Sequence, residues 1–196
     1  MAKSIFFEGI DGTGKSTLTK ALKEHLEATG KQVITLREPG GSAYYEAIRE
    51  HIHFQQLDRT PLSDALTCAG GIAENIRQTK KALSEDIWVI TDRSYISNAV
   101  YQAAQGLDLA LAEKINALAL DGFTYDLRIL LDMPLDQASA RLSSIGKKKD
   151  RWETMGDDYF RTIQKLYQDI AKREQMTVLD ASESVDKLIA QIMPLI

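Results

Sequence analysis

Eight residues near the amino terminus have the composition of a loop that binds phosphate groups. Residues 9–16 read G-I-D-G-T-G-K-S and match the pattern G-x-x-x-x-G-K-[ST] in full. Glycines let the backbone N–H groups turn toward one point, and the start of a following helix adds partial positive charge. Lys15 can reach the β- and γ-phosphates of a nucleoside triphosphate such as ATP, and the Ser16 hydroxyl can bind Mg²⁺. The residues expected to contact the triphosphate are Gly9, Ile10, Asp11, Gly12, Thr13, Gly14, Lys15, Ser16 and Thr17.

Three further segments carry charged and polar side chains suited to binding anions. Residues 37–41 read R-E-P-G-G, and residues 92–102 read D-R-S-Y-I-S-N-A-V-Y-Q. Residues 141–153 contain two arginines and three consecutive lysines. Phosphoryl transfer depends on positioning and charge compensation more than on covalent steps. Cations that converge on two anionic substrates are therefore the machinery we expect from these segments.

In order and spacing, the phosphate-binding loop and these three segments resemble the thymidylate kinase family of nucleoside-monophosphate kinases. The resemblance extends over nearly the whole chain. It implies an α/β fold, the three-layer P-loop nucleotide kinase fold, with a five-stranded parallel sheet covered by helices on both faces. It also implies that ATP and dTMP, with Mg²⁺, are converted to ADP and dTDP. Small-molecule nucleotides would then be the partners, and a homodimer through residues 62–120 is an open option.

The resemblance gives individual residues a role. Asp11 matches an acidic loop position near the acceptor sugar and phosphate, and Arg93 matches an arginine that holds the acceptor phosphate. The P-loop contains no arginine, which is typical of the subtype whose mobile lid, here about residues 141–153, supplies arginines to the transferring group. We favour Arg151 for that role, and Arg141 for contact with ATP. The implied catalytic residues are Asp11, Lys15, Arg93 and Arg151, and the implied acceptor-site residues are Arg37, Glu38, Pro39, Arg93, Ser97, Tyr101 and Gln102.

Each of these segments also has a purely structural interpretation. Arg93 could form an ion pair with Asp92 or Glu38, and the R-E-P-G-G segment could simply end a strand. Tyr101 could belong to the core, and the lysine run could be a solvated surface. Asp132 fits turn chemistry better than catalysis, because it ends a strand.

The chain departs from the family pattern where the acceptor base should bind. In the family a phenylalanine stacks on thymine and an arginine four residues later helps to recognise it, and these positions are Cys68 and Ile72 here. Cysteine offers little stacking surface, and isoleucine offers no hydrogen bond. Glu74 and Asn75 are candidate polar replacements on the same predicted helix. A related P-loop kinase with another nucleotide or a nucleoside as acceptor is therefore an alternative.

Short apolar segments alternate with longer helical patterns along the chain. The two longest helical patterns cover residues 62–83 and residues 97–120. Strands that are separated by helices form parallel sheets covered on both faces, and ligands bind beyond the carboxyl ends of such strands. The predicted strands are residues 4–8, 32–36, 87–91, 127–131 and 176–179.

Composition limits the remaining function classes. The 196 residues carry 24 basic and 28 acidic side chains, so a net charge of −4 argues against general binding to nucleic acid or anionic membranes. The chain length suggests one domain over residues 1–196. With a single cysteine, Cys68, and no long apolar run, we expect a cytoplasmic protein without a membrane span.

Two further functions compete with a kinase. A nucleotide-binding module without catalysis would explain the altered base site, although it has no need of Lys15, Ser16 and Arg93 together. A GTPase switch is disfavoured because the sequence has no N-K-x-D segment that would read guanine.

Overall fold

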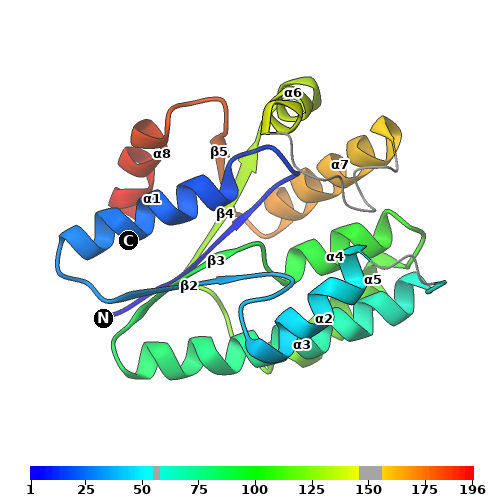
Figure 1. Ribbon diagram of the computed structural model, residues 1–196, viewed down its shortest axis with the longest axis horizontal. Coiled ribbons are helices and arrows are strands. Elements are labelled where there is room, and N and C mark those ends of the chain that lie inside the picture. The colour runs from blue at the N-terminus through cyan, green and yellow to red at the C-terminus, as the bar shows by residue number, and fades with distance from the viewer. Residues whose placement is uncertain (55–57, 146–155) are drawn as a thin grey trace.

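One parallel sheet of five strands organises the computed structural model, which describes residues 1–54, 58–145 and 156–196 (Figure 1). The strand order is β2-β3-β1-β4-β5. Every residue of β1 is buried, as expected for a central strand whose two faces are both covered. The strands are β1 (Ser4–Glu8), β2 (Val33–Arg37), β3 (Trp88–Asp92), β4 (Leu127–Asp132) and β5 (Thr177–Asp180).

Helices cover both faces of this sheet. On one face α1 (Lys15–Ala28) crosses the central strands and packs beside α8 (Val185–Ile192), which a short 3₁₀ turn, η2 (Met193–Leu195), follows. On the other face α3 (Pro61–Ser84), α4 (Tyr95–Ala103) and α5 (Leu109–Leu120) pack together, and α7 (Asp157–Arg173) lies against β4 and α4. The predicted fold class is thereby confirmed.

The predicted elements are confirmed with small shifts, except in three places, one of which is helix α6 (Leu135–Ile145), which was not predicted. Helix α2 (Ala43–Phe54), which packs on α3, was not predicted, although Tyr45 and Ile48 have helical spacing. The helical pattern at residues 97–120 is not one helix but two. Gly106 adopts a φ of 100°, which ends α4, and the Asp108 carboxylate then accepts a hydrogen bond from Leu111 N and begins α5.

The phosphate-binding loop connects β1 to α1 and is held against its neighbours. Gly12 has a φ of 90°, and a Cβ at this position would lie 2.3 Å from the Ala138 carbonyl oxygen of α6 (Leu135–Ile145). Only glycine fits this position, for both reasons. The predicted lid overlaps α6 through Ile145, and the rest of it lies outside the described residues.

Among the described residues, no helix has both the length and the apolar character that a membrane crossing requires.

Candidate active site

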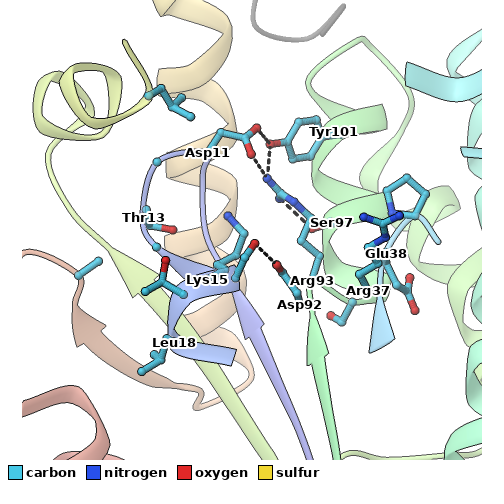
Figure 2. A pocket seen from close by; sticks show the side chains of 18 of the residues that line it. Asp11, Thr13, Lys15, Leu18, Arg37, Glu38, Asp92, Arg93, Ser97 and Tyr101 are labelled. Carbon is cyan, nitrogen blue, oxygen red and sulfur yellow. Dashed lines mark hydrogen bonds and ion pairs between the residues drawn. The ribbon is translucent and has the colours of Figure 1, made fainter. Parts of the chain in front are cut away.

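A cavity of about 760 Å³ opens at the carboxyl ends of β1, β2 and β3, where such sheets bind ligands. The loop before α1 forms one wall, and residues from the ends of β2 and β3 and from α4 face it (Figure 2). Two ends of the cavity can be distinguished by their elements. The α2–α3–α4 end includes Pro39, Tyr45, Arg49, Cys68, Asn98 and Gln102, and the opposite end includes Arg141, Leu142, Ala181, Glu183, Ser184, Val185 and Leu188.

The loop closes around the ammonium group of Lys15. Lys15 Nζ donates to the carbonyl oxygens of Gly9 at 3.0 Å and Ile10 at 2.8 Å. Gly9 and Ile10 do not line the cavity, so they act through these oxygens, whereas residues 11–17 line it. Burial, together with the nearby Arg93 cation, lowers the pKa of Lys15 to about 8, while the carboxylates of Asp11, Asp92 and Glu8 oppose the shift. An incoming phosphate would therefore meet an ammonium group that the loop already holds in place.

Ser16 and Asp92 place two oxygen ligands side by side. The Ser16 hydroxyl donates to Asp92 Oδ2, which joins the start of α1 to the end of β3. Mg²⁺ prefers such hard oxygen donors and commonly takes only one or two from the protein, with the rest from water and phosphate. The donor set therefore fits Mg²⁺, with Asp92 added to the predicted ligand Ser16.

Arg93 joins the phosphate-binding loop to α4. Its Nη2 donates to Asp11 Oδ1 at 2.7 Å and to the Tyr101 hydroxyl at 3.2 Å, as Figure 2 shows. Its Nη1 lies 3.2 Å from the carbonyl oxygen of Gly9 and from the hydroxyl of Ser97. Burial alone would lower the pKa of Arg93, but the Asp11 carboxylate raises it above its usual value. The alternative in which Arg93 pairs with Asp92 or Glu38 is wrong, since Asp11 is the partner.

The buried Glu8 carboxylate fixes the position of α4. Glu8 Oε1 accepts hydrogen bonds from the backbone N–H groups of Ser94 and Ser97, and both serine hydroxyls also donate to this carboxylate. A carboxylate at a helix N-terminus satisfies N–H groups that lack helical partners and suits the helix dipole. Glu8 thereby sets the register of the segment that carries Arg93 and Tyr101.

Helix α3 holds the R-E-P-G-G segment in place through Asn75. Asn75 Nδ2 donates to the carbonyl oxygens of Arg37 at 3.2 Å and Gly40 at 2.8 Å. Asn75 does not line the cavity, so this candidate for reading the base is wrong, and its role is to hold the turn. Glu74 is hydrogen-bonded to Arg77 on the same helix.

Glu38 brings a buried carboxyl group into the cavity. Burial raises its pKa well above the usual value, although a hydrogen bond with Asn75 opposes the shift. Arg37 instead extends outward and forms two hydrogen bonds with Glu46 of α2, at 3.0 Å and 2.7 Å. The segment is therefore more than a strand-ending turn, since Arg37, Glu38 and Pro39 all line the cavity.

Asn98 presents a hydrogen-bond acceptor that sequence reasoning missed. Its Nδ2 donates to Ala65 O at 3.0 Å and to Asn116 Oδ1 at 2.8 Å, which uses both of its hydrogens. Its Oδ1 is buried and has no hydrogen-bond partner among the described residues. Asn98 lines the cavity beside Gln102, which is also buried. Its place inside residues 92–102, one turn before Tyr101, was the available signal.

The amino-acid sequence matches known proteins of one family over nearly its whole length. The family model for thymidylate kinase matches residues 7–192. A protein named thymidylate kinase from Prosthecochloris aestuarii is 36% identical over 200 residues, which cover 96% of this chain and 90% of that protein. Another of that name, from Thermosipho melanesiensis, is 35% identical, with 98% of this chain and 96% of that protein covered. The chain belongs to the thymidylate kinase family. It is accordingly a phosphotransferase that acts on nucleotides.

The two positions that the resemblance assigns to binding of the acceptor base lie in different surroundings. Cys68 lines the cavity, whereas Ile72 is fully buried in the main hydrophobic core and does not line it. Tyr45 and Arg49 of α2 line the same end, and neither was predicted. Arg49 Nη1 donates to the Pro39 carbonyl oxygen.

Only one cation of the predicted lid, Arg141, lies within the described residues. Arg141 lines the far end of the cavity, where its Nη1 donates to the Ala181 carbonyl oxygen at 2.8 Å. Arg151 and the three lysines lie outside the described residues. Asp132 accepts hydrogen bonds from Gln164 and Gln168 of α7 and does not line the cavity.

Proposed function

We propose that this protein transfers the γ-phosphoryl group of ATP to dTMP and releases ADP and dTDP. The observation that supports the proposal is the ion pair between Asp11 and Arg93, a junction that brings a cation from the end of β3 against the phosphate-binding loop that holds Lys15. A molecule bound at each end of the cavity would bring its phosphate to this junction. Membership of the thymidylate kinase family supports the choice of substrates.

On the donor side, the backbone N–H groups of the loop and the Lys15 ammonium group would hold the β- and γ-phosphates. Ser16 and Asp92 would bind Mg²⁺, which supplies charge neutralisation for the phosphate oxygens when it is present. Arg141 stands at the far end of the cavity, where the nucleoside of ATP would lie. The role of Arg151 in the transfer stays a prediction.

On the acceptor side, an oxygen of the dTMP phosphate would attack the γ-phosphorus, while the bond to the β–γ bridging oxygen breaks and ADP leaves. This phosphate is largely a dianion at neutral pH, so no catalytic base is required. Arg93 would offset its charge and orient it. The raised pKa of Glu38 keeps that carboxyl group protonated more readily, which limits repulsion of the acceptor.

Asn98 supports thymine over cytosine as the acceptor base. Its amide cannot turn round, because Ala65 O and Asn116 Oδ1 both require the NH₂ group. The free Oδ1 can therefore only accept a hydrogen bond. At N3, thymine and uracil would offer it an N–H donor, whereas cytosine would offer an acceptor and carries its donor on the neighbouring N4 amino group. A buried acceptor left facing another acceptor would lose about 1–3 kcal/mol.

The test is ADP release from purified protein with ATP, Mg²⁺ and each of dTMP, dUMP, dCMP, dAMP and dGMP, and with thymidine as a nucleoside acceptor. We expect dTMP to give the highest kcat/KM, dUMP to follow, and dCMP to be poor. Turnover with thymidine or another nucleotide would correct the acceptor. ATP binding without turnover on any acceptor would favour a non-catalytic module. Lys15→Ala serves as the inactive control.

We further propose that two chains associate through the α3–α5 region and that the enzyme works in the cytoplasm. Leu66 of α3 is 55% exposed and Leu118 of α5 is 83% exposed, and these two helices pack on each other. Exposed apolar side chains on neighbouring helices favour a protein partner. The lone cysteine, Cys68, is buried and free, which suits a reducing compartment.

A further inference from the structure

An aromatic ring from α2 lies at the end of the cavity where α3 would be expected to provide one. Tyr45 is 1% exposed and packs with Cys68 and Ile48 in a small apolar cluster of its own. Tyr45 and Cys68 both line the cavity, together with Pro39 and Glu38. The backbone of Tyr45 is also held in place, because Tyr45 N donates a hydrogen bond to Ser42 Oγ at 3.0 Å, next to the R-E-P-G-G turn.

Gly71 makes room for this ring. A Cβ built on Gly71 would lie 2.2 Å from Cγ and Cδ2 of Tyr45, which no side chain could tolerate. A Cβ on the neighbouring Gly70 would lie 3.7 Å from the Tyr44 hydroxyl, an ordinary contact. Glycine within a helix is unfavourable relative to alanine. The Tyr45 ring therefore explains why position 71 is glycine, whereas no such contact requires glycine at position 70.

Tyr45 and Cys68 also form a polar contact and remain uncharged. The Tyr45 hydroxyl and the Cys68 thiol influence each other's pKa: their interaction raises the pKa of Tyr45 and opposes the rise in the pKa of Cys68. Burial raises the pKa of Cys68 to about 12 and raises the pKa of Tyr45 well above its usual value. At neutral pH this wall is therefore a neutral surface of ring, thiol and hydroxyl, without the guanidinium group that Ile72 replaces.

We propose that Tyr45, seated on Gly71 and against Cys68, is the wall that contacts the acceptor base and selects the acceptor by shape. The aromatic surface has moved from α3 to α2, and Cys68 and Gly71 are small because the ring fills their space. The inference rests on the proposed function and names the residue that supplies the apolar contact with the base. The hydrogen bond at N3 of the base stays with Asn98.

The experiment measures KM for dTMP and for ATP in Tyr45→Ala, Cys68→Phe and the double variant. Tyr45→Ala should raise KM for dTMP about 10- to 100-fold, the range expected for loss of one aromatic–base contact. Cys68→Phe should also raise it, because the new ring and Tyr45 compete for one space. In the double variant the ring returns to α3, so KM for dTMP should fall below that of either single variant. KM for ATP should change less than threefold throughout, about the size of a weak secondary effect.

Three controls separate recognition from folding. Ile48→Ala removes apolar contact from the same cluster outside the cavity lining, so it should lower thermal stability without a selective rise in KM for dTMP. Gly70→Ala should leave both KM values near those of the parent, whereas Gly71→Ala should raise KM for dTMP because it displaces the Tyr45 ring. Tyr45→Phe keeps the ring and should keep most of the affinity.

The results also separate this inference from the proposed function. If the parent enzyme uses dTMP but Tyr45→Ala leaves KM for dTMP unchanged, or raises both KM values equally, Tyr45 is not the selectivity determinant. If the effects of the two substitutions on KM for dTMP simply add in the double variant, the two rings do not compete for one space and the inference is overturned. If the parent enzyme does not use dTMP, the proposed function itself fails, and the variants are compared on the acceptor that it does use.

Discussion

Two buried cations give the site its character at the scale of single residues. Lys15 is bonded to two carbonyl oxygens of its own loop, and Arg93 is bonded to the carboxylate of Asp11. Both are held in place before any substrate binds. Such preorganisation is the main contribution that a protein makes to phosphoryl transfer, because little covalent chemistry is required of it.

The lowered pKa of Lys15 predicts proton uptake when ATP binds. Burial disfavours the charged form, so above about pH 8 the free protein holds a neutral lysine, and the phosphates of ATP favour the charged form again. At about pH 8.5 the ATP phosphates are already ionised, so calorimetry in buffers of different ionisation enthalpy should report uptake by the protein. ATP affinity should weaken as the pH rises through 8. Lys15→Met should remove the buffer dependence, and its persistence in that variant would contradict the assignment.

Replacement of Arg93 by lysine tests the junction with Asp11. Lysine cannot donate to Asp11 and Tyr101 at the same time with the same geometry. We expect Arg93→Lys to lower kcat by roughly 10²-fold and to raise KM for dTMP. Arg128→Lys is the matched control, since Arg128 pairs with Glu174 away from the cavity. A loss of thermal stability alone in Arg93→Lys would reduce the arginine to a structural ion pair.

At the scale of elements, contacts between helices and strand ends place the catalytic segments. The Glu8 carboxylate at the end of β1 binds the start of α4, and Asn75 in the middle of α3 binds the turn after β2. Neither side chain needs to touch substrate. Each converts an otherwise irregular connection into a fixed wall of the cavity, which is how loops on a rigid scaffold carry function.

Asn75→Ala should loosen the R-E-P-G-G turn. Two buried carbonyl oxygens would lose their hydrogen-bond donor, at about 1–3 kcal/mol of unfolding free energy. We expect KM for dTMP to rise more than KM for ATP, because only the acceptor side of the cavity moves. Glu74→Ala, one residue earlier on α3, breaks a surface pair with Arg77 and should change neither stability nor KM by much. Unfolding curves and steady-state kinetics on both variants decide the point.

At the scale of the whole molecule, the α3–α5 region leaves apolar surface uncovered in a single chain. If two copies pair there, a charge at Leu66 should prevent it. We expect the parent protein to have the mass of two chains by light scattering and Leu66→Lys to have the mass of one. Val178→Lys is the control, because Val178 is 54% exposed but lies on β5. A parent protein that is monomeric at micromolar concentration would rule the pairing out.

Local sequence signals determined much of this protein. The five strands and the phosphate-binding loop follow from short patterns, because an apolar run and a glycine-rich turn are properties of neighbouring residues. The class of reaction follows as well, because the order and spacing of the motifs resemble those of one family. The departure at Cys68 and Ile72 was inferred from the same resemblance.

Contacts between distant residues were decided only by the tertiary structure. Three features depend on contacts between segments 26 to 82 positions apart. They are the ion pair of Asp11 with Arg93, the free oxygen of Asn98, and the packing of the Tyr45 ring on Gly71. Spacing along the chain carries no signal for them, because a side chain's partner is set by how helices pack on the sheet. The sequence by itself therefore determined which chemistry is present, and packing decided which residues surround the acceptor.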